Sequence, residues 1–113
     1  MEIGQRIREL RKQKHLTLRQ LAQMARINHT YLSKIENARL SHTPSVRTLR
    51  YLARALGVDE LELLQLANKL PSGFDEIAKN RDALRFFRLA SKVVSSNELW
   101  KDLERYLEER AKR

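Results

Sequence analysis

Cysteine is absent from the 113-residue sequence, and no apolar run approaches the roughly 20 residues that a membrane-spanning helix needs. Without cysteine, the chain can form neither a disulfide framework nor a metal site with thiolate ligands. The segment MEIGQRIREL is charged and lacks the apolar core of a signal peptide. We therefore expect a soluble, cytoplasmic protein that has no membrane partner.

Sequence patterns of catalytic and cofactor-binding sites are also missing. There is no glycine-rich phosphate-binding loop. The three histidines, His15, His29 and His42, are dispersed without paired acids at the spacing of metal ligands. We therefore expect a protein that is not an enzyme and that uses no cofactor and no metal.

The net charge of +9 is concentrated in the first half of the chain. Residues 1–57 contain twelve Lys or Arg and three Glu, which together give +9, so residues 58–113 are neutral overall. A phosphate-binding face requires such a local excess of basic side chains. The distribution therefore favours a nucleic acid as the partner of the first half.

The length fits one small domain, or a small domain with an extension, and allows one modest core. Leu70-Pro71-Ser72-Gly73 is the clearest break in the helical pattern. Beyond it the chain is charge-balanced and contains all three Phe and the single Trp. We predict a first domain at residues 1–70 and a helical extension at residues 71–113.

Residues 17–37 predict two short helices joined by a tight turn. Thr17 is a suitable N-cap, Gln20 completes a capping box with it, and Asn28 is the N-cap of the second helix. Leu32 and Ile35 lie on one face of this second helix, whereas short polar and basic side chains lie on the other. A helix of this kind suits the major groove of DNA.

Three further helices complete the first domain. The first covers residues 2–14, and His15 follows it in the link to the next helix. The next begins after the N-cap Ser45 and ends at Gly57 as a left-handed C-cap. The last covers about residues 60–68 and is expected to bury these side chains: Leu61, Leu64 and, as a further candidate, Leu63.

Several motifs in one order resemble the lambda-repressor/Cro (XRE-like) helix-turn-helix family. They are Leu21-Ala22, Ile27, YLSKIEN at 31–37, Pro44-Ser45 and LARALGV at 52–58. The resemblance covers residues 3–66. It implies an all-α fold, with a five-helix lambda-repressor-like DNA-binding domain followed here by a helical C-terminal extension. It also implies a structural ion pair between Arg11 and Glu36. Because the family often has Gly in the link after the first helix, it further implies a left-handed residue at His15.

The resemblance further implies which side chains contact DNA. Base-reading residues are expected on the third helix: His29, Thr30, Ser33 and Lys34. Backbone contacts are expected around it: Arg19, Gln20, Asn28, Tyr31, Asn37 and Arg39. Lys34 can donate to guanine O6 and N7. Leu18 stands where the family often has a phosphate-contacting Gln, so Arg19 and Gln20 are the candidates for that contact.

One short helix reads only a few base pairs, so we expect a homodimer on an inverted-repeat operator of double-stranded DNA. The function implied is that of a sequence-specific transcriptional regulator, with a dimeric repressor preferred. Activation through contact with a polymerase stays open, because the motif does not encode the sign of regulation.

The extension is predicted to form helices over about residues 81–94 and 97–110, after a short turn at Phe74 and Ile77. Two helices of some 40 residues cannot bury its aromatic side chains alone. We expect self-association first, then packing on the first domain, then a foreign partner. The alternative function is an antitoxin-type or protease-controlled regulator whose C-terminal helices bind another protein. The expected interface residues are Phe86, Phe87, Trp100, Leu103, Tyr106 and Leu107.

Overall fold

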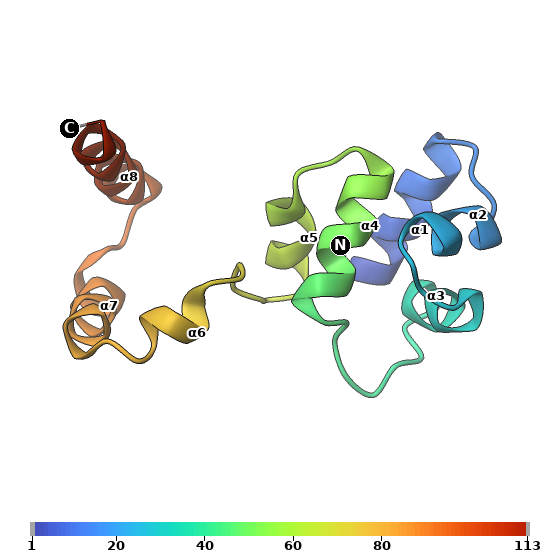
Figure 1. Cartoon of the computed structure of the whole chain (residues 1–113), viewed down its shortest axis with the longest axis horizontal. Helices are drawn as coiled ribbons and strands as arrows, with labels where there is room; N and C mark the ends of the chain where they lie inside the picture. The colour runs from blue at the N-terminus through green and yellow to red at the C-terminus, as the bar shows by residue number, and fades with distance from the viewer. Residues whose placement is uncertain (1, 113) are drawn as a thin grey trace. The chain divides into compact units, whose positions relative to one another are not determined.

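The computed structural model describes residues 2–112, and all regular structure in this range is α-helical (Figure 1). The helices are α1 (Ile3–Gln13), α2 (Leu18–Met24), α3 (His29–Glu36), α4 (Val46–Leu56), α5 (Glu60–Leu66), α6 (Phe74–Ile77), α7 (Arg81–Val93) and α8 (Asn97–Ala111). The predicted all-α fold is confirmed, with five helices in the first part of the chain and further helices after them.

Side-chain caps begin the helices at the predicted positions. Thr17 Oγ1 accepts a hydrogen bond from the Gln20 N–H at 3.1 Å, and Gln20 Oε1 accepts from the Thr17 N–H at 2.8 Å. Asn28 Oδ1 accepts from the Thr30 N–H at 2.7 Å. Each bond satisfies an N–H group that has no acceptor within its own helix. Side-chain N-caps also begin four later helices, at Ser45, Asp59, Asn80 and Ser96.

The helix ends use left-handed residues. Gly57 follows α4 with φ of 71°, and His15 follows α1 with φ of 56°, so both predictions are confirmed. Arg26 and Ala38 adopt φ of 58° and 55° after α2 and α3. A left-handed residue reverses the chain within a few residues, which keeps the connections between α1, α2 and α3 short.

The first five helices enclose one apolar core. Its innermost side chains are Ile7, Leu21, Leu32, Leu49, Leu52, Leu56, Leu63 and Leu64. The prediction that Leu61 is buried was wrong, because its side chain is 55% exposed. α5 buries Leu63 and Leu64 instead, together with Ala67 just after it, and leaves Leu61 exposed. The run of leucines in α5 fits more than one helical face, so the packing of α5 on α4 selects the buried one.

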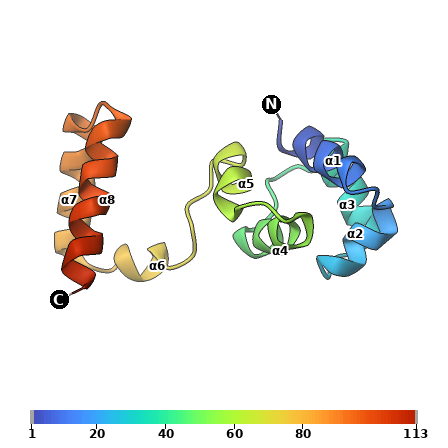
Figure 2. The same ribbon diagram turned by 90° about the horizontal axis from the view of Figure 1, so that it is seen from above.

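The chain divides after Ser72 into two compact units. The second unit contains α6, α7 and α8, and Figure 2 shows its two longer helices lengthwise. Phe87 packs against Phe74 and Phe86, with ring centroids 5.5 and 5.1 Å apart. Ala90 is the one buried residue between 73 and 112, so this unit has almost no core of its own. Across residues 2–112, no helix is long and apolar enough to cross a membrane.

Candidate nucleic-acid interface

The third helix presents a polar outer face above a buried inner one. Leu32 and Ile35 are buried in the core of the first unit. Thr30 and Lys34 are exposed, and His29 and Ser33 are half-buried. The four side chains therefore lie on the solvent side of one short helix, at the spacing that places neighbours along one face.

An ion pair fixes α3 to α1. Arg11 Nε and Nη2 donate to the two carboxylate oxygens of Glu36 at 2.8 and 2.9 Å, and Arg11 Nη1 donates to the carbonyl oxygen of Leu16 at 3.0 Å. The Glu36 side chain is 1% exposed. Hydrogen bonding to Glu36 raises the pKa of Arg11 above its ordinary value. The buried carboxylate is thus held by a bidentate partner, which a stable buried charge requires.

Arg8 is a second partner of this pair that the sequence did not indicate. Its Nε lies 3.4 Å from Glu36 Oε1, and its Nη2 donates to Asn37 Oδ1 at 2.6 Å. Asn37 Nδ2 in turn donates to the carbonyl oxygen of Ser33 at 2.8 Å. The chain of bonds ties the last turn of α3 to α1. Only the helix spacing of Arg8 and Arg11 on α1 could have indicated this arrangement.

Gly4 is another residue that the sequence did not single out. It is buried, and a Cβ atom added there would overlap the carbonyl oxygen of Ile35. α1 therefore approaches α3 more closely than any residue with a side chain permits. Together with the Arg11–Glu36 pair, this close approach sets the position of α3 in the fold.

Two amide side chains near the start of α2 and α3 are oriented by their capping roles. The oxygens of Gln20 and Asn28 accept backbone hydrogen bonds, at 2.8 and 2.7 Å. Neither amide nitrogen donates a hydrogen bond to another residue between 2 and 112. Both residues are exposed, as is Arg19 between the two caps. The free N–H groups are donors that suit phosphate oxygens.

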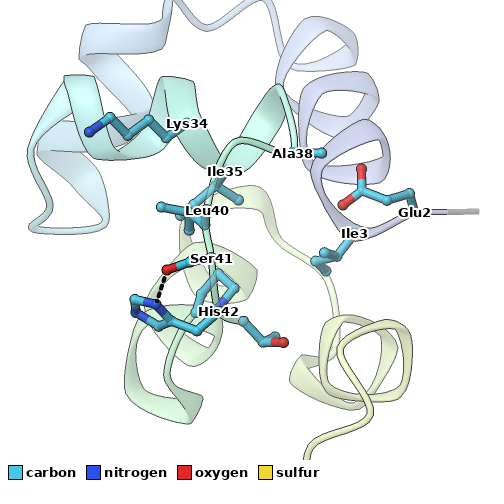
Figure 3. Close-up of a pocket in the computed structure, with 10 residues that line it drawn as sticks. Glu2, Ile3, Lys34, Ile35, Ala38, Leu40, Ser41 and His42 are labelled. Atoms are coloured by element: carbon cyan, nitrogen blue, oxygen red, sulfur yellow. Dashed lines mark hydrogen bonds between the residues drawn. The ribbon is translucent and has the colours of Figure 1, made fainter.

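The remaining expected contact residues lie at the sides of α3. Tyr31 is half-buried against the core, and Arg39 is exposed directly after the helix. The loop that follows borders a groove of about 240 Å³ beside the start of α1 (Figure 3). Ser41 Oγ and His42 Nδ1 lie 3.2 Å apart there, and the Lys34 side chain extends away from Glu2.

A cluster of arginines around Tyr51 is a feature that sequence reasoning missed. The guanidinium carbons of Arg26, Arg47 and Arg54 lie 5.5, 5.6 and 5.7 Å from the centre of the Tyr51 ring. These are cation–π distances. Arg47 lowers the pKa of the Tyr51 hydroxyl, mainly by a hydrogen bond and then by its charge, with smaller contributions from Arg26 and Arg50.

Between residues 2 and 112, no group of three or more His, Cys, Asp or Glu side chains is placed to hold a metal ion. The surface of the first unit carries exposed basic and amide side chains, which are hydrogen-bond donors.

A family model described as a helix-turn-helix domain matches residues 4–69. Two curated relatives are similar over part of the chain. The immunity repressor protein of Bacillus phage phi105 is 45% identical over 58 residues, which are 51% of this chain and 39% of the relative. The HTH-type transcriptional regulator DdrOP3 of Deinococcus deserti is 35% identical over 85 residues, 68% of this chain and 64% of the relative. The chain thus spans less than two thirds of either relative.

Two solved structures are similar as well. The master regulator for biofilm formation SinR, in complex with DNA, is 39% identical over 55% of this chain and 97% of that one, with a TM-score of 0.51. A chain of the SinR protein/SinI protein complex is 26% identical and covers 98% of this chain and 99% of that one, with a TM-score of 0.53. The second match extends through α6, α7 and α8, because it leaves almost none of the chain unmatched.

Proposed function

We propose that this protein is a sequence-specific transcriptional regulator that binds double-stranded DNA, because the chain belongs to the lambda-repressor/Cro-like (XRE-like) helix-turn-helix family. α3 is the helix that enters the major groove. His29, Thr30, Ser33 and Lys34 read base edges, and repression by occlusion of a promoter is the preferred outcome. The site of action is the cytoplasm, where the DNA of the bacterial and phage relatives is found.

The observation that carries this proposal is the fixed position of α3. Its inner face is buried, its last turn is tied to α1 through Glu36, and its outer face bears only polar and basic groups. A base-reading helix needs this rigidity, because hydrogen bonds to base edges tolerate little displacement. Phosphate contacts orient α3 on the duplex. Those before its first turn come from Arg19, Gln20 and Asn28, and the others come from Tyr31, Asn37 and Arg39.

The domain assignment is part of the proposal. Residues 1–70 form the DNA-binding domain, and residues 71–113 hold two copies together as a homodimer on an inverted repeat. The support lies in the exposed apolar side chains of α7 and α8. Phe86, Trp100, Tyr106 and Leu107 are between 43% and 65% exposed. Leaving large aromatic and aliphatic groups in water is unfavourable, so burial against a second copy is expected to stabilise both.

Selection of bound sequences from random duplex DNA is the test of this function. The full-length protein should enrich one motif, and the motif should be an inverted repeat with half-sites about one helical turn, ~34 Å, apart. Binding should weaken steeply as salt rises, because lysine and arginine contacts to phosphate release counterions. Recovery of random sequences, with no motif enriched, would contradict sequence-specific binding.

A second candidate function is that of a regulator whose C-terminal helices bind another protein. The match over nearly the full chain to a protein solved as the SinR/SinI complex favours it, as does a groove of about 180 Å³ in the second unit. The groove is lined by apolar side chains of α7, of α8 and of Val94, which directly follows α7. They are Phe86, Leu89, Ala90, Val93, Val94, Leu99 and Leu103. A heterologous protein that dissolves the homodimer by occupying this surface would establish the second candidate.

A further inference from the structure

The charges of the first unit are compensated unevenly. Residues 1–57 contain three acidic side chains, and all three act at α1. Glu2 caps α1, Glu9 pairs with Arg6, and Glu36 holds Arg8 and Arg11. Each arginine of α1 therefore forms an ion pair within the protein. Arg6 pairs with Glu9 and also with Glu62 of α5, and Arg8 and Arg11 pair with Glu36 of α3.

The arginines around Tyr51 have no such partner. No Asp or Glu carboxylate between residues 2 and 112 forms an ion pair with Arg26, Arg47 or Arg54. Three cations nevertheless gather within 5.7 Å of one ring centre. Arg50 adds a fourth positive charge on α4, the helix that also carries Tyr51. Its Nη1 donates to Ser72 Oγ at 3.5 Å. Within residues 2–112, the cluster thus lacks a carboxylate counter-ion.

The Tyr51 ring explains why three cations can lie together and why their hydrogen-bond donors suit an anion. A guanidinium that lies over an aromatic face keeps N–H groups of its planar edge available, and in this cluster only Arg47 also hydrogen-bonds the Tyr51 hydroxyl. Those edges match the two oxygens of a phosphate or carboxylate group bidentately. Since Tyr51 is half-buried against the core, the ring itself is held in place. The arrangement therefore presents preorganised donors for an anion.

The position of Arg26 favours a phosphate of DNA as that anion. Arg26 lies in the turn between α2 and α3, two residues before the N-cap Asn28. Two peptide links span at most about 7.6 Å. The major groove is about 12 Å wide and is bordered by a phosphate strand on each side. An arginine this close to the start of a groove-reading helix is within reach of the bordering strand.

We propose that Arg26, Arg47 and Arg54, held around Tyr51, form a second phosphate-binding site that grips the DNA backbone beside the groove read by α3. The proposal rests on the function proposed above and adds a contact to it. The site gives affinity without base preference, because a phosphate carries no sequence information. Tyr51 is a positioning residue, and the arginines make the contact.

The test uses the full-length protein, a duplex that carries its selected site and a scrambled duplex of equal length. Binding of Arg26→Gln, Arg47→Gln and Arg54→Gln is measured over a series of salt concentrations. Each variant should bind both duplexes more weakly by a similar factor, and its salt slope should fall by about 0.9 for each lost phosphate contact. Arg88→Gln on the exposed side of α7 makes the same charge change outside the cluster and should leave the slope unchanged.

Tyr51 is tested by two substitutions whose helicity and melting are checked first. Tyr51→Phe keeps the ring face and should retain the parent's salt slope, whereas Tyr51→Leu removes it and should lower the slope as the arginine variants do. Equal losses in both variants would refute the positioning role of the ring, because the hydroxyl would then be the important group.

Three outcomes separate the inference from the proposed function. Arginine variants with the parent's affinity and slope, in a protein that still selects its site, overturn the inference alone. Binding to polyglutamate, which represents an acidic protein segment, is measured in parallel. Arginine variants that lose binding to polyglutamate and keep binding to DNA also overturn the inference, and they assign the cluster to an acidic protein segment. A parent that binds neither duplex overturns both proposals.

Discussion

Arg11 and Glu36 are 25 positions apart and are joined by two parallel hydrogen bonds of 2.8 and 2.9 Å between guanidinium and carboxylate. The pair connects α1 to the last residue of α3, and the carboxylate side is almost completely buried. α3 is therefore positioned by a charge that water cannot screen. Disturbing this pair should affect folding and DNA binding together.

Arg11→Met should lower the free energy of unfolding by roughly 3 kcal/mol, because it leaves the buried Glu36 carboxylate with the longer contact to Arg8 alone. Chemical denaturation of the parent and variant measures the difference. Glu9→Gln is the control, because it removes an ion pair whose acid is 41% exposed and should change stability by about 1 kcal/mol or less. Equal losses in both variants would show that the Arg11–Glu36 pair has no special role.

Gly4→Ala should destabilise the protein by about 1–3 kcal/mol, since its Cβ would overlap the carbonyl oxygen of Ile35 and push α1 from α3. The sign is informative, because Ala in a helix normally stabilises by about 0.5–1 kcal/mol relative to Gly. Thermal melting gives the result. Gln5→Ala, at the next and exposed position, should change stability little. A more stable Gly4→Ala variant would disprove the close approach.

Lys34→Ala should relax the preference for one base pair by roughly 1–3 kcal/mol while leaving the others. The measurement is competitive binding to duplexes that differ at single positions of the selected site. Arg39→Ala, an exposed residue just beyond α3, should instead weaken all duplexes alike. If Lys34→Ala keeps the parent's preference at every position, α3 does not read bases as proposed.

A chain that ends at Ser72 should stay folded and become monomeric. Its first unit keeps every innermost core side chain and the Arg50–Ser72 hydrogen bond. Analytical ultracentrifugation and circular dichroism measure the two properties, and binding to the full inverted repeat should lose its cooperativity. Trp100→Ala combined with Leu103→Ala should have the same effect in the full-length protein. A truncated chain that still dimerises would place the interface in α1 to α5.

Tyr51 should ionise at lower pH than an ordinary tyrosine, because Arg47 lowers its pKa. The difference in tyrosinate absorbance between the parent and Tyr51→Phe isolates this group during a pH titration. Arg47→Gln should move the pKa back toward the ordinary value of about 10.

The lowered pKa also fixes the sign of a stability effect. The folded state favours the phenolate, so its contribution to stability is complete above the unfolded pKa of about 10 and disappears as pH falls through the folded pKa. The stability of the parent relative to Tyr51→Phe should therefore rise with pH between these values. A constant difference would show that the pKa is unchanged by folding.

The sequence by itself determined the helices and the places where they begin. Thr17, Asn28 and Ser45 cap helices through hydrogen bonds to N–H groups two or three positions away, so the information is local. The apolar period likewise identified the buried face of α3, and the family motifs identified its base-reading candidates, whose roles in DNA binding stay predictions.

Only the tertiary structure decided which distant side chains meet. Arg8 reaches Asn37, Arg26 reaches Tyr51, and Gly4 faces Ile35, across separations of 25 residues or more. The same packing turned Leu61 outward although its residue type and spacing favoured burial. Such contacts depend on the angle and distance at which two helices cross, and no local period or cap encodes these quantities.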